Sequence, residues 1–219
     1  MRITRIESQK RRPGRKNIYV DGAFFTAASD ETLLRLGLRP GEELTPELLD
    51  RLFRTESRLT TKAAALRLLA VRPRSVRELR DRLRTKNLPP EEIEAVITDL
   101  ERAALLDDRA FARSYIRDRT VLKAAGPSLL RERLLRLGVP RPILEEVMTE
   151  ELSALDLDLL ARRAAEAYLR KHAPRGHSRS DAGLRRRAAA HLTRRGFDWE
   201  TISRVLKRAL SDEPGGEDE

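Results

Sequence analysis

The sequence predicts a mostly α-helical protein, with three tandem three-helix repeats in an elongated array, preceded by a small N-terminal β element and short helices. Three observations lead to this prediction. Residues 1–27 contain short runs of β-branched and aromatic residues, the chain from about Leu59 shows only helical periodicity, and one segment of that helical part recurs. A single unit is too small to bury its apolar faces well, so neighbouring units must stack.

The N-terminal β element is predicted to be a hairpin or a three-stranded sheet. Residues 18–20 and 23–25 are rich in β-branched and aromatic side chains, and Ile3 and Ile6 precede them. Between the two runs lies Asp21-Gly22, a strong hairpin signal because both central residues of a type I′ turn need positive φ. The preceding segment 10–16 is basic and is interrupted by Pro-Gly, so we expect an exposed loop.

Two helices are expected next. Ser29 or Asp30 can cap the first, and Gly37 fits the left-handed position that ends it. The second begins at Thr45-Pro46, a helix cap followed by proline at the first helical position. Its hydrophobic pattern extends toward residue 71, and the sequence leaves open whether it breaks near residues 55–60.

The repeat is visible when residues 75–89 (SVRELRDRLRTKNLP) are aligned with residues 126–140 (GPSLLRERLLRLGVP), a shift of 51. A further shift of 58 reaches residues 183–198. In this register Asn87, Gly138 and Gly196 occupy one position, where a residue in the left-handed conformation can end a helix. The following helices carry equivalent buried trios: Ile93, Val96 and Ile97; Leu144, Val147 and Met148; Ile202, Val205 and Leu206.

The repeats divide the chain. The leading helices are predicted at residues 62–71, 108–122 and 157–172, and a loop is predicted at 173–181. The predicted parts are the N-terminal β element with short helices (1–58), the first repeat (59–106), the second (107–152), the third (153–211) and an acidic tail (212–219).

The chain is basic, with 45 Lys and Arg against 35 Asp and Glu and a formal net charge of +10. The last eight residues contain five acids and no base, so the remainder carries +15. Such a charge attracts polyanions, nucleic acid first among them. An alternative stays open, because only seven of the bases are lysine and an arginine-rich composition can also follow from GC-rich coding.

Secretion, membrane insertion and catalysis find no support. No apolar run approaches the ~20 residues of a membrane span, the N-terminus lacks a signal peptide, and there is no cysteine, so we expect a cytoplasmic protein. Asp107-Asp108 is read as a helix start, not as a catalytic pair. The histidines lack zinc-binding spacing and no phosphate-binding glycine loop occurs. We therefore expect a non-enzymatic protein without cofactor or metal.

The few aromatic residues are expected to contribute to packing. Phe111, Tyr115 and Tyr168 lie at helical spacing among apolar residues, which is typical of core positions. Trp199 lies near the start of the last helix, where packing is expected in preference to recognition.

Several of these segments resemble the RecX family. Residues 65–70 (ALRLLA) followed by 72–79 (RPRSVREL) are similar to the opening of the first RecX repeat. Residues 105–112 (LLDDRAFA) are similar to the junction of its first and second repeats, and Gly126-Pro127 also fits. The resemblance covers residues 60–152 well and 153–210 more loosely, and the first 27 residues are similar to a β segment found in some members.

The resemblance implies a cytoplasmic bacterial modulator of RecA in DNA repair, homologous recombination and the SOS response. Family members bind the groove of the RecA filament on single-stranded DNA, lower its ATPase and strand exchange, and limit filament extension. The expected partners are RecA, free or in the filament, and nucleic acid through a basic face; no membrane contact is expected, and the protein is expected to be a monomer. The resemblance supplies no catalytic residue and no cofactor.

Two groups of bases are the candidates for partner or nucleic-acid binding. Arg77, Arg80 and Arg84 form one stripe at i, i+3 and i+7, opposite the apolar positions of their helix. For any single base a solvated surface is the ordinary interpretation, but the stripes recur on units that stack into one surface. The candidates are Arg72, Arg74, Arg77, Arg80, Arg84, Arg113, Arg117, Arg119 and Lys123.

A rival interpretation is a helix-turn-helix-like DNA-binding transcriptional regulator, since three-helix units with a Gly- or Asn-ended turn resemble that motif. Two features count against it. The turn recurs three times in series, and the trailing helices (90–104, 141–150 and 198–210) combine an apolar stripe with mixed charge. A plain interaction scaffold is the third alternative.

Overall fold

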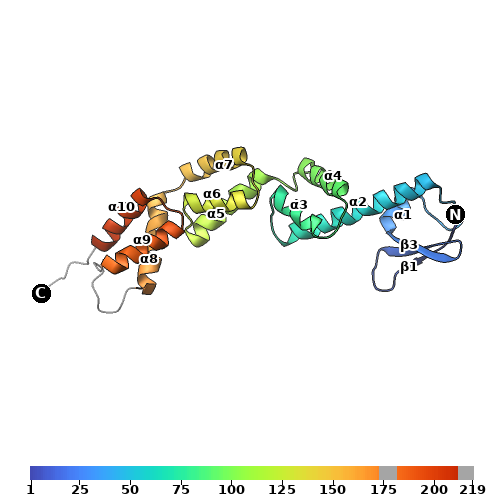
Figure 1. Ribbon diagram of the computed structural model, residues 1–219, viewed down its shortest axis with the longest axis horizontal. Coiled ribbons are helices and arrows are strands. Elements are labelled where there is room, and N and C mark those ends of the chain that lie inside the picture. Colours follow the sequence, from blue (N-terminus) through green and yellow to red (C-terminus); the bar gives the residue numbers. More distant parts are fainter. Residues whose placement is uncertain (173–181, 212–219) are drawn as a thin grey trace. The chain divides into compact units, whose positions relative to one another are not determined.

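The computed structural model describes residues 1–172 and 182–211 (Figure 1). The predicted loop at 173–181 and the acidic tail at 212–219 lie outside these ranges. The chain divides into two compact units. The first comprises Met1–Pro73 and Leu79–Leu106, and the second comprises Arg74–Glu78 and the chain from Asp107 onward. The prediction of a mostly helical protein with a small N-terminal β element and three three-helix repeats is confirmed.

The N-terminal element is a three-stranded antiparallel sheet of order β1-β2-β3. Its strands are β1 (Ile3–Ser8), β2 (Arg15–Val20) and β3 (Ala23–Ser29). Asp21 and Gly22 form the predicted turn with φ of 48° and 88°. The sheet packs on the following helices through a buried cluster that includes Ile3, Ile18, Leu33 and Leu52.

The two predicted helices follow. In α1 (Asp30–Leu36) the Ser29 hydroxyl accepts a hydrogen bond from the Thr32 amide, and Gly37 ends the helix at φ 66°. Thr45 caps α2 (Pro46–Val71), which is continuous. The question of a break near residues 55–60 is thus answered, and the predicted boundary at 58/59 falls within one helix that leads into the first repeat.

The remaining helices fall into the order expected from the register (Figure 1). The first repeat adds α3 and α4 to the end of α2. The second repeat contains α5, α6 and α7, and the third contains α8, α9 and α10. Their bounds are α3 Val76–Arg84, α4 Pro90–Arg102, α5 Asp108–Lys123, α6 Pro127–Arg136, α7 Arg141–Ser153, α8 Leu157–His172, α9 Ala182–Arg194 and α10 Trp199–Ser211.

The predicted trios on α4, α7 and α10 are buried in all three repeats, each residue being at most 4% exposed. In the second repeat they contact Leu130 and Leu134 of α6, and in the third they contact Leu184 and Leu192 of α9. Phe111 is buried, and Tyr115 and Tyr168 pack at the edges of these clusters, as predicted. The prediction for Trp199 was wrong: this side chain is 72% exposed, because it lies at the first position of α10, outside the buried stripe.

The second unit contains two equivalent joints. The Gly126 amide, before α6, donates to the Arg195 carbonyl at 2.7 Å, and the Ser128 amide donates to the Gly196 carbonyl at 3.1 Å. One repeat earlier, the Ser75 hydroxyl before α3 donates to the Leu137 carbonyl. Shifts of 51 and 58 interconvert these positions, so the start of one middle helix binds the turn that ends the next.

Glycine is required in both turns. Gly138 and Gly196 have φ of 84° and 89°, a conformation that costs an L-residue roughly 1–2 kcal/mol. A Cβ atom on Gly196 would lie 2.3 Å from the Leu129 amide nitrogen, and one on Gly138 would lie 2.3 Å from the Arg77 side chain. The two glycines that the sequence register predicts to end a helix thus also lie where neighbouring repeats touch.

Candidate partner and nucleic-acid interface

The candidate bases around α3 differ in their surroundings. Arg74 is 8% exposed and is paired with Glu78. The exposed Arg77 lies against the Gly138 turn, and the guanidinium of Arg72 donates to the Pro73 carbonyl at 3.0 Å. These three side chains therefore contact residues at the start of α3 or the turn that lies against it.

Arg80 and Arg84, the other two members of the predicted stripe, both approach Glu94 of α4. Arg80 Nε lies 2.8 Å from Glu94 Oε1, and a second hydrogen bond of 2.9 Å joins its Nη2 to Oε2. Arg84 is 3.7 Å from the same carboxylate. The Arg80 hydrogen bond raises the pKa of the arginine and lowers the pKa of Glu94. The positive charge of this stripe is thus partly neutralised within the first repeat.

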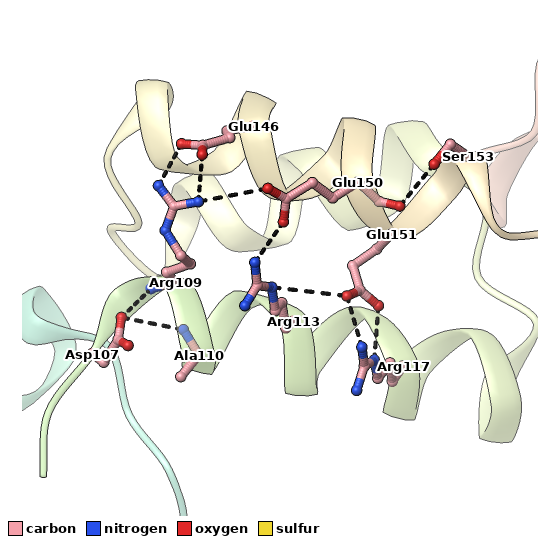
Figure 2. Close-up of polar contacts among 9 residues, drawn as sticks. All are labelled: Asp107, Arg109, Ala110, Arg113, Arg117, Glu146, Glu150, Glu151 and Ser153. Atoms are coloured by element: carbon pink, nitrogen blue, oxygen red, sulfur yellow. Dashed lines mark hydrogen bonds and ion pairs between the residues drawn. The ribbon is translucent and has the colours of Figure 1, made fainter. Parts of the chain in front are cut away.

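Figure 2 shows a row of ion pairs between α5 and α7, here termed the ion-pair ladder. Arg109 binds Glu146 with both nitrogens of its guanidinium tip, and this hydrogen bonding raises the pKa of Arg109 and lowers that of Glu146. The ion-pair ladder consists of Arg109 with Glu146 and Glu150, Arg113 with Glu150 (2.6 Å) and Glu151, and Arg117 with Glu151 (2.8 Å).

Ion pairs at equivalent positions recur in different repeats, between middle and trailing helices and between leading and trailing helices. Arg131–Glu145 in the second repeat (3.1 Å) lies 51 residues after Arg80–Glu94 in the first. The third repeat contains Asp158–Arg204 (2.8 Å), and the caps Asp107 and Asp156 set its register. The two caps are 49 residues apart, which aligns Asp158 with Arg109, and the shift of 58 between the trailing helices aligns Arg204 with Glu146. The pair between leading and trailing helices is therefore present with its polarity reversed.

Arg119 and Lys123, at the end of α5, lie on a different surface. They line a cavity of about 380 Å³ formed by α5, α6, α9 and the turn after α9, here termed the cationic cavity. Apolar side chains, Leu129 and Leu130 among them, form part of its wall. Its basic lining residues are Arg119, Lys123, Arg133, His191, Arg194 and Arg195.

The described part of the chain supplies no counter-charge to the cationic cavity. No acidic residue of the described chain lines it, and its arginines and lysine make no ion pair with any described residue. The Arg119 guanidinium lies 5.1 Å from the centre of the Tyr115 ring, and the His191 ring stacks on Tyr168 at 4.6 Å. Burial, and then the charges of Arg195 and Arg194, lower the pKa of His191.

Two of the cavity's basic residues, Arg119 and Lys123, were among the candidates predicted from the sequence. The other four were missed: Arg133, His191, Arg194 and Arg195. For Arg194 and Arg195 a signal was present, because the repeat register aligns the turn at 195–196 with the turn at 137–138. What the register does not contain is which neighbouring helix each turn contacts.

Asp107 and Asp108 have structural roles. The Asp107 carboxylate accepts hydrogen bonds from the amides of Arg109 and Ala110 at 2.8 and 3.2 Å (Figure 2). Asp108 is buried and accepts from the Val76 amide at 2.8 Å. The carboxylates are therefore occupied at the starts of α5 and α3. Within residues 1–172 and 182–211, no cluster of potential metal ligands and no helix with the length and apolarity of a membrane span occurs.

Comparison with known proteins shows which family has this architecture. The chain matches, in order, the N-terminal domain of regulatory protein RecX (1–45) and the first (62–100), second (107–148) and third (160–206) RecX three-helix domains. It is 30% identical over 210 residues to "Regulatory protein RecX" of Clostridioides difficile, covering 95% of this chain and 96% of that one. The chain belongs to the RecX family.

Further RecX proteins agree with this assignment. "Regulatory protein RecX" of Lacticaseibacillus paracasei is 32% identical over 204 residues, which is 93% of this chain and 82% of the relative. The fold is that of a solved structure of regulatory protein RecX, with a TM-score of 0.68, 24% identity and coverage of 94% and 98%. RecX from Lactobacillus salivarius gives a TM-score of 0.59 at 20% identity, with coverage of 70% and 97%.

Proposed function

We propose that the protein binds RecA, free and in the filament groove on single-stranded DNA, and inhibits its ATPase, filament extension and strand exchange. The observation that carries this proposal is the series of four RecX domains along one chain, in a protein whose relatives are named regulatory proteins. The protein acts as a binding partner in the cytoplasm, during DNA repair and recombination, and catalyses no reaction itself.

The repeats support a mechanism in which one molecule contacts several RecA subunits. Two joints of the same design connect successive middle helices. Similar units in series match a partner that is itself a series of identical subunits. Each repeat then touches a neighbouring RecA subunit, and the molecule resists the rearrangement that ATP turnover requires.

The experiment is a measurement of RecA ATPase on single-stranded DNA with and without this protein. We expect inhibition at substoichiometric protein, because one molecule bound in the groove restrains several subunits. A variant lacking residues 153–219, checked for helicity by circular dichroism, should inhibit less because it spans fewer subunits. Full potency in that variant would overturn the multi-subunit mechanism but not RecA binding.

The helix-turn-helix-like regulator remains the rival, and it predicts a different outcome. A regulator of that class would bind particular duplex sequences and leave RecA ATPase unchanged. The structure offers little for this role, because the turn at Gly196 is occupied by the start of α6. Selective duplex binding without an ATPase effect would replace our proposal with the rival.

A further inference from the structure

We infer that the cationic cavity between the second and third repeats is a phosphate-binding site for the backbone of single-stranded nucleic acid. This inference stands apart from the proposed action on RecA, because it concerns the protein and nucleic acid alone. It rests on the composition of the cavity, on the lack of carboxylates among its described lining residues, and on its contrast with the ion-paired arginines elsewhere in the same unit.

The first argument is electrostatic. Arg119, Lys123 and Arg133 face the same 380 Å³ cavity as Arg194 and Arg195. Like charges gathered around one concave surface repel each other, and the concave shape concentrates their field. Because no carboxylate of the described chain lines the wall, an anion from outside residues 1–172 and 182–211 would relieve this repulsion, and we infer that a nucleic-acid phosphate supplies it.

The second argument compares these bases with the others in the same unit. The arginines of the ion-pair ladder each bind a glutamate of α7, and on α6 Arg136 is paired with Glu132. On those same helices, Arg119, Lys123 and Arg133 form no ion pair with any residue of 1–172 and 182–211. The chain therefore neutralises its bases on one side of α5 and leaves them available on the other.

The third argument concerns the type of anion. Arginine, which supplies four of the cavity's bases, presents a planar fork of N–H donors that matches the oxygens of a phosphate. The apolar wall at Leu129 and Leu130 and the half-buried ring of His191 offer surfaces for the sugar and base attached to that phosphate. Several basic residues on separate elements suit a chain of successive phosphodiesters better than one isolated anion.

Single strands fit better than duplex DNA. A duplex groove is read by an inserted helix or strand. Single strands instead lie in positively charged grooves, where their nucleobases contact aromatic and apolar side chains. The cavity is a recess between helices, and the ring of His191, which stacks on Tyr168, lies within its wall and not on a projecting helix.

The test compares two double variants that remove the same charge from the same helices. Arg133→Gln/Arg194→Gln alters the cavity, and Arg136→Gln/Arg185→Gln alters α6 and α9 outside it. All four side chains are exposed, so folding should be retained, as circular dichroism would verify. The probe is a fluorescein-labelled oligothymidylate, and its affinity is measured by anisotropy over a range of salt concentrations.

We expect the cavity variant to bind about tenfold or more weakly at low salt. Its slope of log affinity against log salt should fall by about 1.4, since each single-strand phosphate contact contributes about 0.7. The control variant should keep both values close to those of the parent. Equal losses in the two variants would show attraction by net charge alone, and unchanged binding in the cavity variant would clear the cavity; either result overturns the inference.

Competition experiments test the chemical class. Inorganic pyrophosphate, ATP and oligoglutamate are each added to the preformed complex with oligothymidylate. We expect oligothymidylate to bind more tightly than any of them per negative charge. Tighter, cavity-dependent binding of ATP would reassign the site to a nucleotide, and tighter binding of oligoglutamate would reassign it to an acidic protein.

His191 supplies a local readout that a structural role of the arginines would not move. Because nearby positive charge contributes to lowering the pKa of His191, a phosphate in the cavity should raise that pKa, as seen by NMR of histidine-labelled protein. An unchanged His191 titration at saturating oligothymidylate would place the nucleic acid elsewhere. RecA ATPase inhibition is measured on the same variants, so that a failure of this inference can be told apart from a failure of the proposed function.

Discussion

Two surfaces of α5 carry basic side chains in opposite electrostatic surroundings. On the ion-pair ladder, Arg109, Arg113 and Arg117 are bound by glutamates of α7. Toward the C-terminal end of the helix, Arg119 and Lys123 face the cationic cavity, whose described wall contains no acid. This difference shows that the charge of a residue alone does not define a binding surface. What defines it is whether the fold supplies the counter-charge.

The largest expected effect comes from disrupting the joint that shapes the cavity while leaving the ladder intact. Gly196→Ala places a Cβ atom on the start of α6 and forces alanine into the left-handed region. We expect a loss of about 2–5 kcal/mol in the free energy of unfolding, from backbone strain and overpacking together. Denaturant titration followed by circular dichroism measures this loss.

Gly41→Ala is the matched control for that variant. Gly41 also has positive φ, at 92°, but a Cβ atom added to it would meet no neighbouring atom within 4 Å. It should lose only the backbone part, about 1–2 kcal/mol. Equal losses in the two variants would mean that the close contact at Gly196 contributes nothing to stability.

The second effect converts the ladder into a surface like the cavity. Glu146→Gln/Glu150→Gln/Glu151→Gln removes the counter-charges from three arginines, so oligothymidylate affinity should rise several-fold and its salt slope should steepen. Stability should change little at Glu146 and Glu150, because exposed ion pairs contribute little to folding, and any loss should come mainly from Glu151, whose side chain is only 13% exposed. Anisotropy titrations measure the binding. No gain in affinity would show that counter-charge is not what separates the two surfaces.

A smaller effect is expected on α3. Arg77→Ala/Arg80→Ala/Arg84→Ala removes the stripe identified from the sequence, and we expect weaker oligothymidylate binding and a reduced salt slope in anisotropy titrations. Because Arg80 and Arg84 already share Glu94, the reduction per arginine should be less than in the cavity variant. A larger reduction per residue would make α3 the principal nucleic-acid contact.

The smallest effect concerns pH. The pKa of His191 is lowered in the folded protein by burial and by Arg195 and Arg194, so the unfolded chain binds its proton more readily. Stability is therefore full above the unfolded pKa of about 6.5 and falls as pH drops through the window down to the lowered value. His191→Gln should remove this step from unfolding curves measured across that window. A step that persists in the variant must come from another group.

The sequence was a good guide wherever the information was local or periodic. Asn87, Gly138 and Gly196 share one position in the repeat register, and all three have the positive φ expected there. Thr45 and Ser29 cap the helices that the residue types indicated. These features depend on neighbours within one turn of helix, or on a repeat that brings equivalent residues to equivalent places.

The candidate interface was less predictable for a physical reason. Helical spacing shows which bases share a face, but the partner of Arg113 is Glu150, 37 residues away on another helix. The cavity is harder still, since Arg194 and Lys123 come from different repeats. Trp199 illustrates the same limit, because one position at a helix start decides whether a ring is buried or exposed.

The joint between repeats has a consequence for how this scaffold can diverge. Between the second and third repeats its hydrogen bonds join main-chain amides to main-chain carbonyls, and its close contact is made at a glycine, so few side chains are needed to hold these two repeats together. The surfaces can then be rewritten independently, as the reversal from Arg109–Glu146 to Asp158–Arg204 within this one chain illustrates. Evolution can alter what such a scaffold attracts without altering how its units are assembled.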